Sequence, residues 1–233
     1  DLLVAASFEG DKTPPKALQT IDSSAFHVAV AAIQKKRFGG KEGEQFSSYD
    51  SALRGASEFL LVGLGKKDAW SQEKLRKRVA SILSYGKCQN VKSIRILAET
   101  FVSGPIRTEA AAELIPETLD RADYRFDKYQ SRKKDEPKHE IASVELLFSK
   151  SSQKSVLDEA LRRARITAEA VNLTRNLINE PANVMPPREL ARYARQTARE
   201  GKFRATVLGP AEIKRNKMGG IIAVSQGSHE PPQ

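Results

Sequence analysis

The sequence has few of the residues that build disulfide frameworks, metal sites or membrane spans. Of its 233 residues one is a cysteine, Cys88, which can form no internal disulfide and favours a reducing compartment. The three histidines, His27, His139 and His229, are isolated, and none has a second His or Cys at ligand spacing. His27 lies in a predicted helix and is expected at the core or its rim. Apolar runs such as 59–62 are too short to cross a bilayer, so we predict no membrane association.

The first residues carry no secretory signal pattern. The chain begins with Asp1 and the apolar run 2–6, and no basic region precedes that run. Together with the single cysteine, this pattern predicts a cytoplasmic protein.

Positive charge is in excess, with a formal net charge of +10. Five short clusters hold much of it, at 35–37, 74–78, 132–134, 162–165 and 214–217. Such a balance can attract nucleic acid through its phosphates, which leaves a nucleic-acid-binding module as one possible function. The other interpretation is solvated helix faces, because acids are mixed in and no aromatic residues interleave to form a base-stacking platform.

Hydrophobic patterning predicts an α/β domain in the first two thirds of the chain. Uniformly apolar, strand-sized segments alternate with segments of helical spacing. The predicted strands are 2–7, 58–64, 93–98 and 142–148, and the predicted helices are 24–36, 71–89 and 107–122. This alternation indicates a mostly parallel or mixed sheet with helices around it. Pro116 is expected to kink or split the last helix.

The remaining third predicts a connector and a partial second layer. Apolar residues at helical spacing run through 155–178, and Pro181 marks the end of that helix. Beyond it we predict a helix at 187–199, a strand at 205–208, a helix at 211–217 and a strand at 220–225. This gives an N-terminal α/β domain at 1–150, a connector helix at 151–182 and the beginning of a further domain at 183–233. So small an α/β layer should leave a sheet edge and an apolar face uncovered.

No catalytic, cofactor-binding or metal-ligating residue is predicted in this chain. Gly63 and Gly65 make a lone Gly-x-Gly, which is more typical of a turn than of a dinucleotide site. The carboxylates of Asp135 and Glu136 lie in a basic stretch where nothing would raise their pKa values. The paired serines have no neighbouring base to activate them.

Several segments resemble the leucyl (cytosol) aminopeptidase family. The most specific are Asn-Glu-Pro-Ala-Asn at 179–183 and Gly-Ser-His-Glu-Pro-Pro at 227–232. Residues 59–66, 124–129 and 218–226 are also similar to the family, and all occur in the family's order. The resemblance covers nearly the whole chain.

The resemblance implies a hydrolase that removes N-terminal residues from peptides. It also implies two divalent metal ions, Zn or Mn, a homo-hexamer, and an N-terminal domain like the macro domains. The family's metal-binding stretches, Gly-Lys-Gly-x-x-x-Asp and Asn-Thr-Asp-Ala-Glu-Gly-Arg, do not occur in these 233 residues. The chain is therefore expected to be a truncated N-terminal part, inactive alone. A nucleotide-like ligand, as in macro domains, is a further possible partner.

Overall fold

The computed structural model describes residues 1–49, 52–131, 140–149 and 154–233. Two compact units make up the chain, Asp1–Val171 and Asn172–Gln233. Residues 132–139, which include the basic cluster at 132–134, Asp135, Glu136 and His139, lie outside the described residues.

A five-stranded sheet forms the centre of the first unit. Its strands are β1 (Leu2–Ser7), β2 (Gln45–Tyr49), β3 (Glu58–Gly63), β4 (Ser93–Leu97) and β5 (Ser143–Leu147). Their order across the sheet is β2-β3-β1-β4-β5, and only β2 is antiparallel to its neighbour. Every residue of β1 and β3 is buried, as expected for uniformly apolar strands covered on both faces. The predicted mixed, mostly parallel sheet is confirmed.

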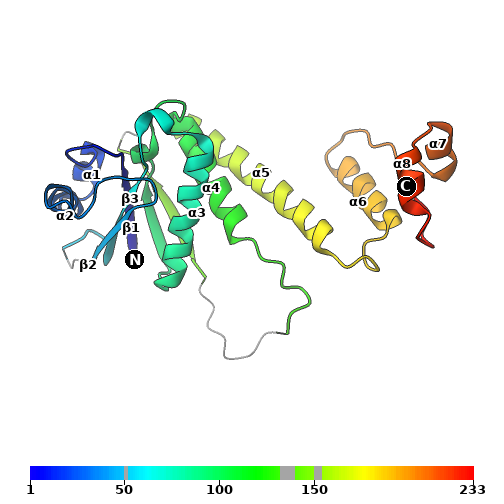
Figure 1. The fold of residues 1–233 in the computed structure, drawn as a ribbon, viewed down its shortest axis with the longest axis horizontal. Helices are drawn as coiled ribbons and strands as arrows, with labels where there is room; N and C mark the ends of the chain where they lie inside the picture. Colours follow the sequence, from blue (N-terminus) through cyan, green and yellow to red (C-terminus); the bar gives the residue numbers. More distant parts are fainter. Residues whose placement is uncertain (50–51, 132–139, 150–153) are drawn as a thin grey trace. The chain divides into compact units, whose positions relative to one another are not determined.

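Helices cover both faces of this sheet (Figure 1). One face carries α1 (Lys16–Ile21) and α2 (Ser23–Gln34), which pack on Leu3 and Ala5 of β1. The opposite face carries α3 (Gln72–Cys88) and α4 (Thr108–Asp123), which pack on Leu2, Val4 and Ala6. Successive side chains of a strand point to opposite faces, so β1 supplies both cores. Two short 3₁₀ turns, η1 (Lys67–Ala69) and η2 (Ala98–Phe101), lead from β3 and β4 into these helices.

Helix α4 is not split at Pro116. Proline removes one backbone hydrogen bond and crowds the preceding turn, which is why we expected an interruption. Leu114, Ile115 and Leu119 beside it are buried in the core shared with α3. This burial stabilises the helix despite the lost hydrogen bond.

The second unit is helical, and two predicted strands are wrong. After α5 (Lys154–Asn179) come α6 (Pro187–Glu200), α7 (Pro210–Arg215) and α8 (Gly219–Ser225). Residues 205–208, predicted as a strand, are irregular, and 220–225, also predicted as a strand, lie in α8. A strand needs a neighbour to pair its backbone groups, whereas a helix pairs them internally. Residues 172–233 contain no strand with which the apolar run at 220–225 could pair, so this run forms a helix.

An apolar surface is nevertheless uncovered in this unit. Leu190 of α6 is 51% exposed and Val224 of α8 is 85% exposed. A cavity of about 530 Å³ lies between α6, α7 and the start of α8, and its lining includes Ala191, Ile213 and Met218.

The glycines of the 61–66 segment serve close backbone packing. Gly63 ends β3 and donates its N–H to the Glu44 carbonyl at 2.8 Å, while Gly65, with φ +76°, donates to the Gly40 carbonyl at 2.9 Å. A Cβ on Gly63 would overlap the Lys41 carbonyl oxygen and lie 2.9 Å from the carbonyl carbon of Gly40. These glycines therefore let the 40–44 loop approach the end of β3.

A buried carboxyl group joins α3 to the start of β3. Glu58 is 2% exposed, and the Tyr85 hydroxyl of α3 donates a hydrogen bond to its Oε1. Burial, followed by this hydrogen bond, raises the pKa of Tyr85 to about 12.

We expect Tyr85→Phe to lower the free energy of unfolding by about 1–3 kcal/mol, because the Glu58 carboxyl loses its donor while it stays buried. Tyr49→Phe is the matched control. The Tyr49 side chain is 69% exposed and its hydroxyl donates to Gln89 at 3.4 Å, so the expected change is within about 0.5 kcal/mol. Denaturant unfolding at neutral pH measures both, and equal losses in the two variants would contradict the role given to Glu58.

The same contact predicts a pH dependence. A pKa that is higher in the folded than in the unfolded state adds stability below the unfolded value, and this is lost as pH rises through the folded one. For Tyr85 the contribution should be complete below pH 10 and lost towards pH 12. Tyr85→Phe should therefore show a shallower fall in stability over that interval than the unaltered chain.

Gly63→Ala should destabilise the first unit by about 1–3 kcal/mol or more, because the atoms that the new methyl group meets are backbone. Gly39→Ala is the control. Its added Cβ would meet only the Glu44 carboxylate at 3.6 Å, an ordinary contact. Thermal unfolding of both variants decides the point, and a Gly63→Ala protein as stable as Gly39→Ala would show that the loop can move away freely.

Candidate functional site

The described residues hold no assembled metal centre. Among them there is no group of three or more His, Cys, Asp or Glu side chains that could bind a metal ion. His27, expected at the core or its rim, is exposed on α2 with its ring 6.1 Å from that of Phe26, so it lies outside the core. His229 is exposed, and Cys88 is an exposed free thiol at the end of α3.

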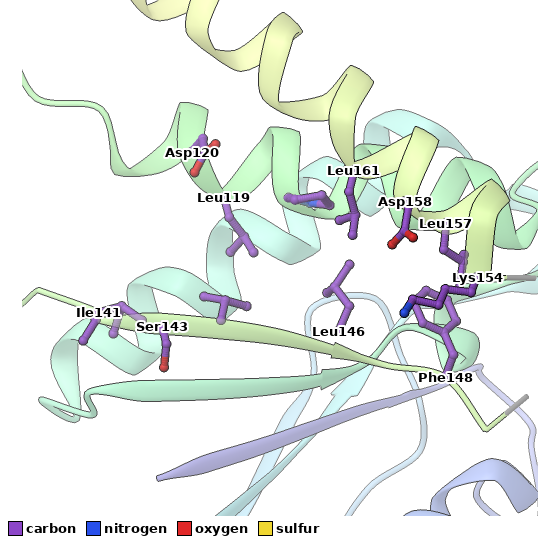
Figure 2. A pocket seen from close by; sticks show the side chains of 13 residues that line it. Leu119, Asp120, Ile141, Ser143, Leu146, Phe148, Lys154, Leu157, Asp158 and Leu161 are labelled. Carbon is purple, nitrogen blue, oxygen red and sulfur yellow. The ribbon is translucent and has the colours of Figure 1, made fainter. Parts of the chain in front are cut away.

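A cavity of the first unit lies between α4, β5 and the first turns of α5 (Figure 2). It measures about 640 Å³. Leu146 and Phe148 on the sheet side face Leu119 of α4 and Leu161 of α5. Apolar side chains thus form most of its wall.

Three charged side chains, Asp120, Lys154 and Asp158, also line this cavity (Figure 2). Burial, with a smaller effect of Asp123, raises the pKa of Asp120 above its usual value. Among the described residues that line this cavity there is neither a histidine nor a cysteine, and Ser143, the one serine among them, has no histidine beside it to activate it. The described side chains of this cavity are therefore better suited to packing against an apolar group than to catalysing hydrolysis.

Helix α5, which forms one wall of this cavity, also carries a buried stripe of small residues. Ala160, Ala164 and Ala168 recur every four residues and are each 1% exposed or less. Next to the stripe, the Arg163 guanidinium binds the Glu113 carboxylate of α4 at 2.9 Å. Small side chains on one face let helices approach closely, so the stripe fixes α5 on the first unit.

A second, more polar cavity of about 440 Å³ lies at the carboxyl ends of the central strands. It is lined by segments that follow β1, β3 and β4. Asp11, Lys16, Lys67 and Glu99 supply two carboxylates and two ammonium groups. Sequence analysis missed it, because these residues are far apart along the chain and match no known motif.

Many basic side chains of the predicted clusters are paired with carboxylates. On α3, Lys74 binds Glu42 at 2.8 Å and Lys77 binds Glu73 at 2.8 Å. On α5, Arg165 binds Glu169 at 2.8 Å. These pairs agree with the interpretation as solvated helix faces.

Comparison with known proteins identifies the family. The model described as "Cytosol aminopeptidase family, N-terminal domain" matches residues 4–133, more than half of the chain. The chain belongs to the cytosol aminopeptidase family. The model of the family's catalytic domain matches residues 172–233. The sequence resemblance is thus confirmed, and the chain is an N-terminal region of this hydrolase family.

Relatives in this family are about twice as long as the chain. A protein of Sulfurihydrogenibium sp., described as a probable cytosol aminopeptidase, is 33% identical over all of this chain and 45% of its own length. One of Aquifex aeolicus with the same description is 33% identical over 97% of this chain and 43% of its own length. The chain therefore spans about half the length of these curated cytosol aminopeptidases.

Solved structures share the fold. A mutant of tomato leucine aminopeptidase matches 99% of this chain and 46% of its own length, with a TM-score of 0.72 and 20% identity. The bottromycin maturation enzyme BotP in complex with Mn matches 99% of the chain, with a TM-score of 0.67 and 19% identity. Within the described residues, no helix has both the length and the apolar character that crossing a membrane requires.

The stripe on α5 gives a prediction about how closely this helix packs on the first unit. Ala164→Leu should lower the unfolding free energy by about 1–3 kcal/mol, because the larger side chain has no room at a position that is 1% exposed. Ala170→Leu, at an exposed position of the same helix, is the matched control and should change it by less than about 0.5 kcal/mol. Chemical denaturation monitored through Trp70, which is buried in the first unit, measures both. Equal stability of the two variants would mean that α5 is not held closely there.

Proposed function

We propose that this chain is the N-terminal part of an aminopeptidase that removes N-terminal residues from peptides. The observation that carries the proposal is the pair of family matches, which follow one another in the order N-terminal domain and catalytic domain. We retain the division into an N-terminal domain at 1–150, a connector helix at 151–182 and the beginning of the catalytic domain at 183–233.

The metal ions of such an enzyme would be bound outside this chain. The described residues do not fit a two-metal site, because they offer no cluster of three or more potential ligands. We therefore propose that two divalent ions, Zn or Mn, are held by residues of the longer protein, and that this chain contributes no catalytic or metal-ligating side chain. The complex of BotP with Mn supports this class of metal.

Assembly and location are part of the same proposal. Peptides would be bound by the remainder of the catalytic domain, and the full-length protein would be a cytoplasmic homo-hexamer. The exposed apolar side chains of α6 and α8 support a role for the second unit in packing against that remainder, because water-exposed apolar surface is stabilised by burial. Neither the paired basic side chains nor the relatives favour nucleic-acid binding, and we do not propose it.

An activity assay tests this function. The purified chain, supplied with Mn²⁺ or Zn²⁺, is expected to release no amine from leucine amides, because it would lack the groups that bind the metals. The full-length Aquifex aeolicus relative, 33% identical, is the positive control under the same conditions. Metal-dependent turnover by the chain alone, abolished by a chelator, would show that the active site lies within these residues and would overturn the proposal.

A further inference from the structure

The polar cavity lies where the connections that follow two neighbouring strands pass to opposite faces of the sheet. After β1 the chain enters α1 and α2 on one face, and after β4 it enters η2 and then α4 on the opposite face (Figure 1). Since β1 and β4 are parallel neighbours, their carboxyl ends lie at the same edge of the sheet. In open α/β sheets, the crevice at such a switch in connection is the usual place for ligands.

The polar cavity, called the crevice from here on, is built into the sheet. β1 pairs with β3 along its whole length, but its pairing with β4 ends at Val4 and Ile96. Beyond that point the Thr100 hydroxyl of η2 accepts the Ala6 N–H at 2.9 Å and donates to the Leu97 carbonyl at 2.7 Å. The strands therefore separate without leaving these backbone groups unpaired, which keeps the opening between them.

Charged groups of both signs line opposite walls of the crevice. Lys67, which follows β3, binds Asp11 of the loop after β1 at 2.8 Å. Asp11 is held in turn by the Phe8 N–H at 3.1 Å. On the wall after β4, Glu99 is fixed by the Ser149 N–H at 2.9 Å. Lys16 adds a second ammonium group on the β1 side.

We propose that this crevice binds a small zwitterion, an α-amino acid or dipeptide. The ligand's ammonium group would bind Glu99, and its carboxylate would bind Lys67 and Lys16, since charge-assisted hydrogen bonds are the strong ones. Phe8 and Val102 supply apolar surface for a side chain. This site is separate from the proposed hydrolysis, and its failure would leave the aminopeptidase assignment intact.

Phosphorylated ligands fit the crevice less well. Phosphate sites commonly use a run of backbone N–H groups or an arginine fork. Here the loop after β1 contributes Pro14 and Pro15, which have no N–H, and the described part of the lining contains no arginine. A nucleotide-like ligand is therefore an outcome that the test must distinguish.

The ligand class is tested by titrating L-leucine into the full chain, followed by calorimetry or amide chemical shifts. We expect L-leucine to bind. N-acetyl-L-leucine, which lacks the ammonium group, and L-leucinamide, which lacks the carboxylate, should each bind at least about tenfold more weakly, the scale of one charge-assisted hydrogen bond. Absence of binding up to about 10 mM L-leucine, equal binding of either derivative, or tighter binding of AMP would overturn the proposal.

Paired variants test the residues. Glu99→Gln keeps an acceptor oxygen for the Ser149 N–H but removes the negative charge. Lys67→Met removes the positive charge on the other wall. Each variant should weaken L-leucine binding by about tenfold. Glu73→Gln and Lys77→Met change an exposed ion pair on α3 and should leave binding unchanged. Thermal unfolding of all four establishes that they are folded. Loss of binding in the α3 variants, or full binding in the crevice variants, would contradict the assignment.

Discussion

The first unit depends on one strand, β1, which is buried on both faces and pairs with a neighbouring strand on each side. In β1 the side chains from Leu2 to Ala6 have no exposed surface, and the strand pairs with β3 on one side and β4 on the other. Burying a Leu or Val side chain contributes about 1.5–3 kcal/mol, and here both helical layers gain from the same strand. The positions of the two helical layers and of the polar cavity at the carboxyl ends of the strands follow from this arrangement.

Segments whose own residues decide their structure were predictable from the sequence. The strand at 2–7, the strand at 58–64 and the helix at 71–89 have unambiguous apolar patterns, and the structure has all three within two residues. The short edge strand β2 and helix α1 were missed, because their few apolar residues give no clear period. The run at 220–225 was assigned wrongly because a short apolar run suits a strand or a helix equally, and its surroundings decide.

The functional features also divide into those that can be read from local sequence and those that depend on the fold. The isolated histidines predict that the sequence offers no zinc pattern, since ligand spacing is a local property that can be read from the chain. The crevice residues Asp11, Lys67 and Glu99 come from three different connections, so only the strand order brings them together. That the chain contributes no catalytic residue stays a prediction, which the activity assay on the purified chain tests.

The strand order also has a consequence for synthesis on the ribosome. Leu2 pairs with Glu58 and with Ile94, so β1 cannot complete its pairing until β4 has left the exit tunnel. Until then the apolar residues Leu2–Ala6 of β1 stay exposed on the nascent chain, and such long-range parallel pairing is intrinsically slow. The arrangement that makes β1 the most protected strand of the folded unit therefore makes it a target for chaperones while translation proceeds.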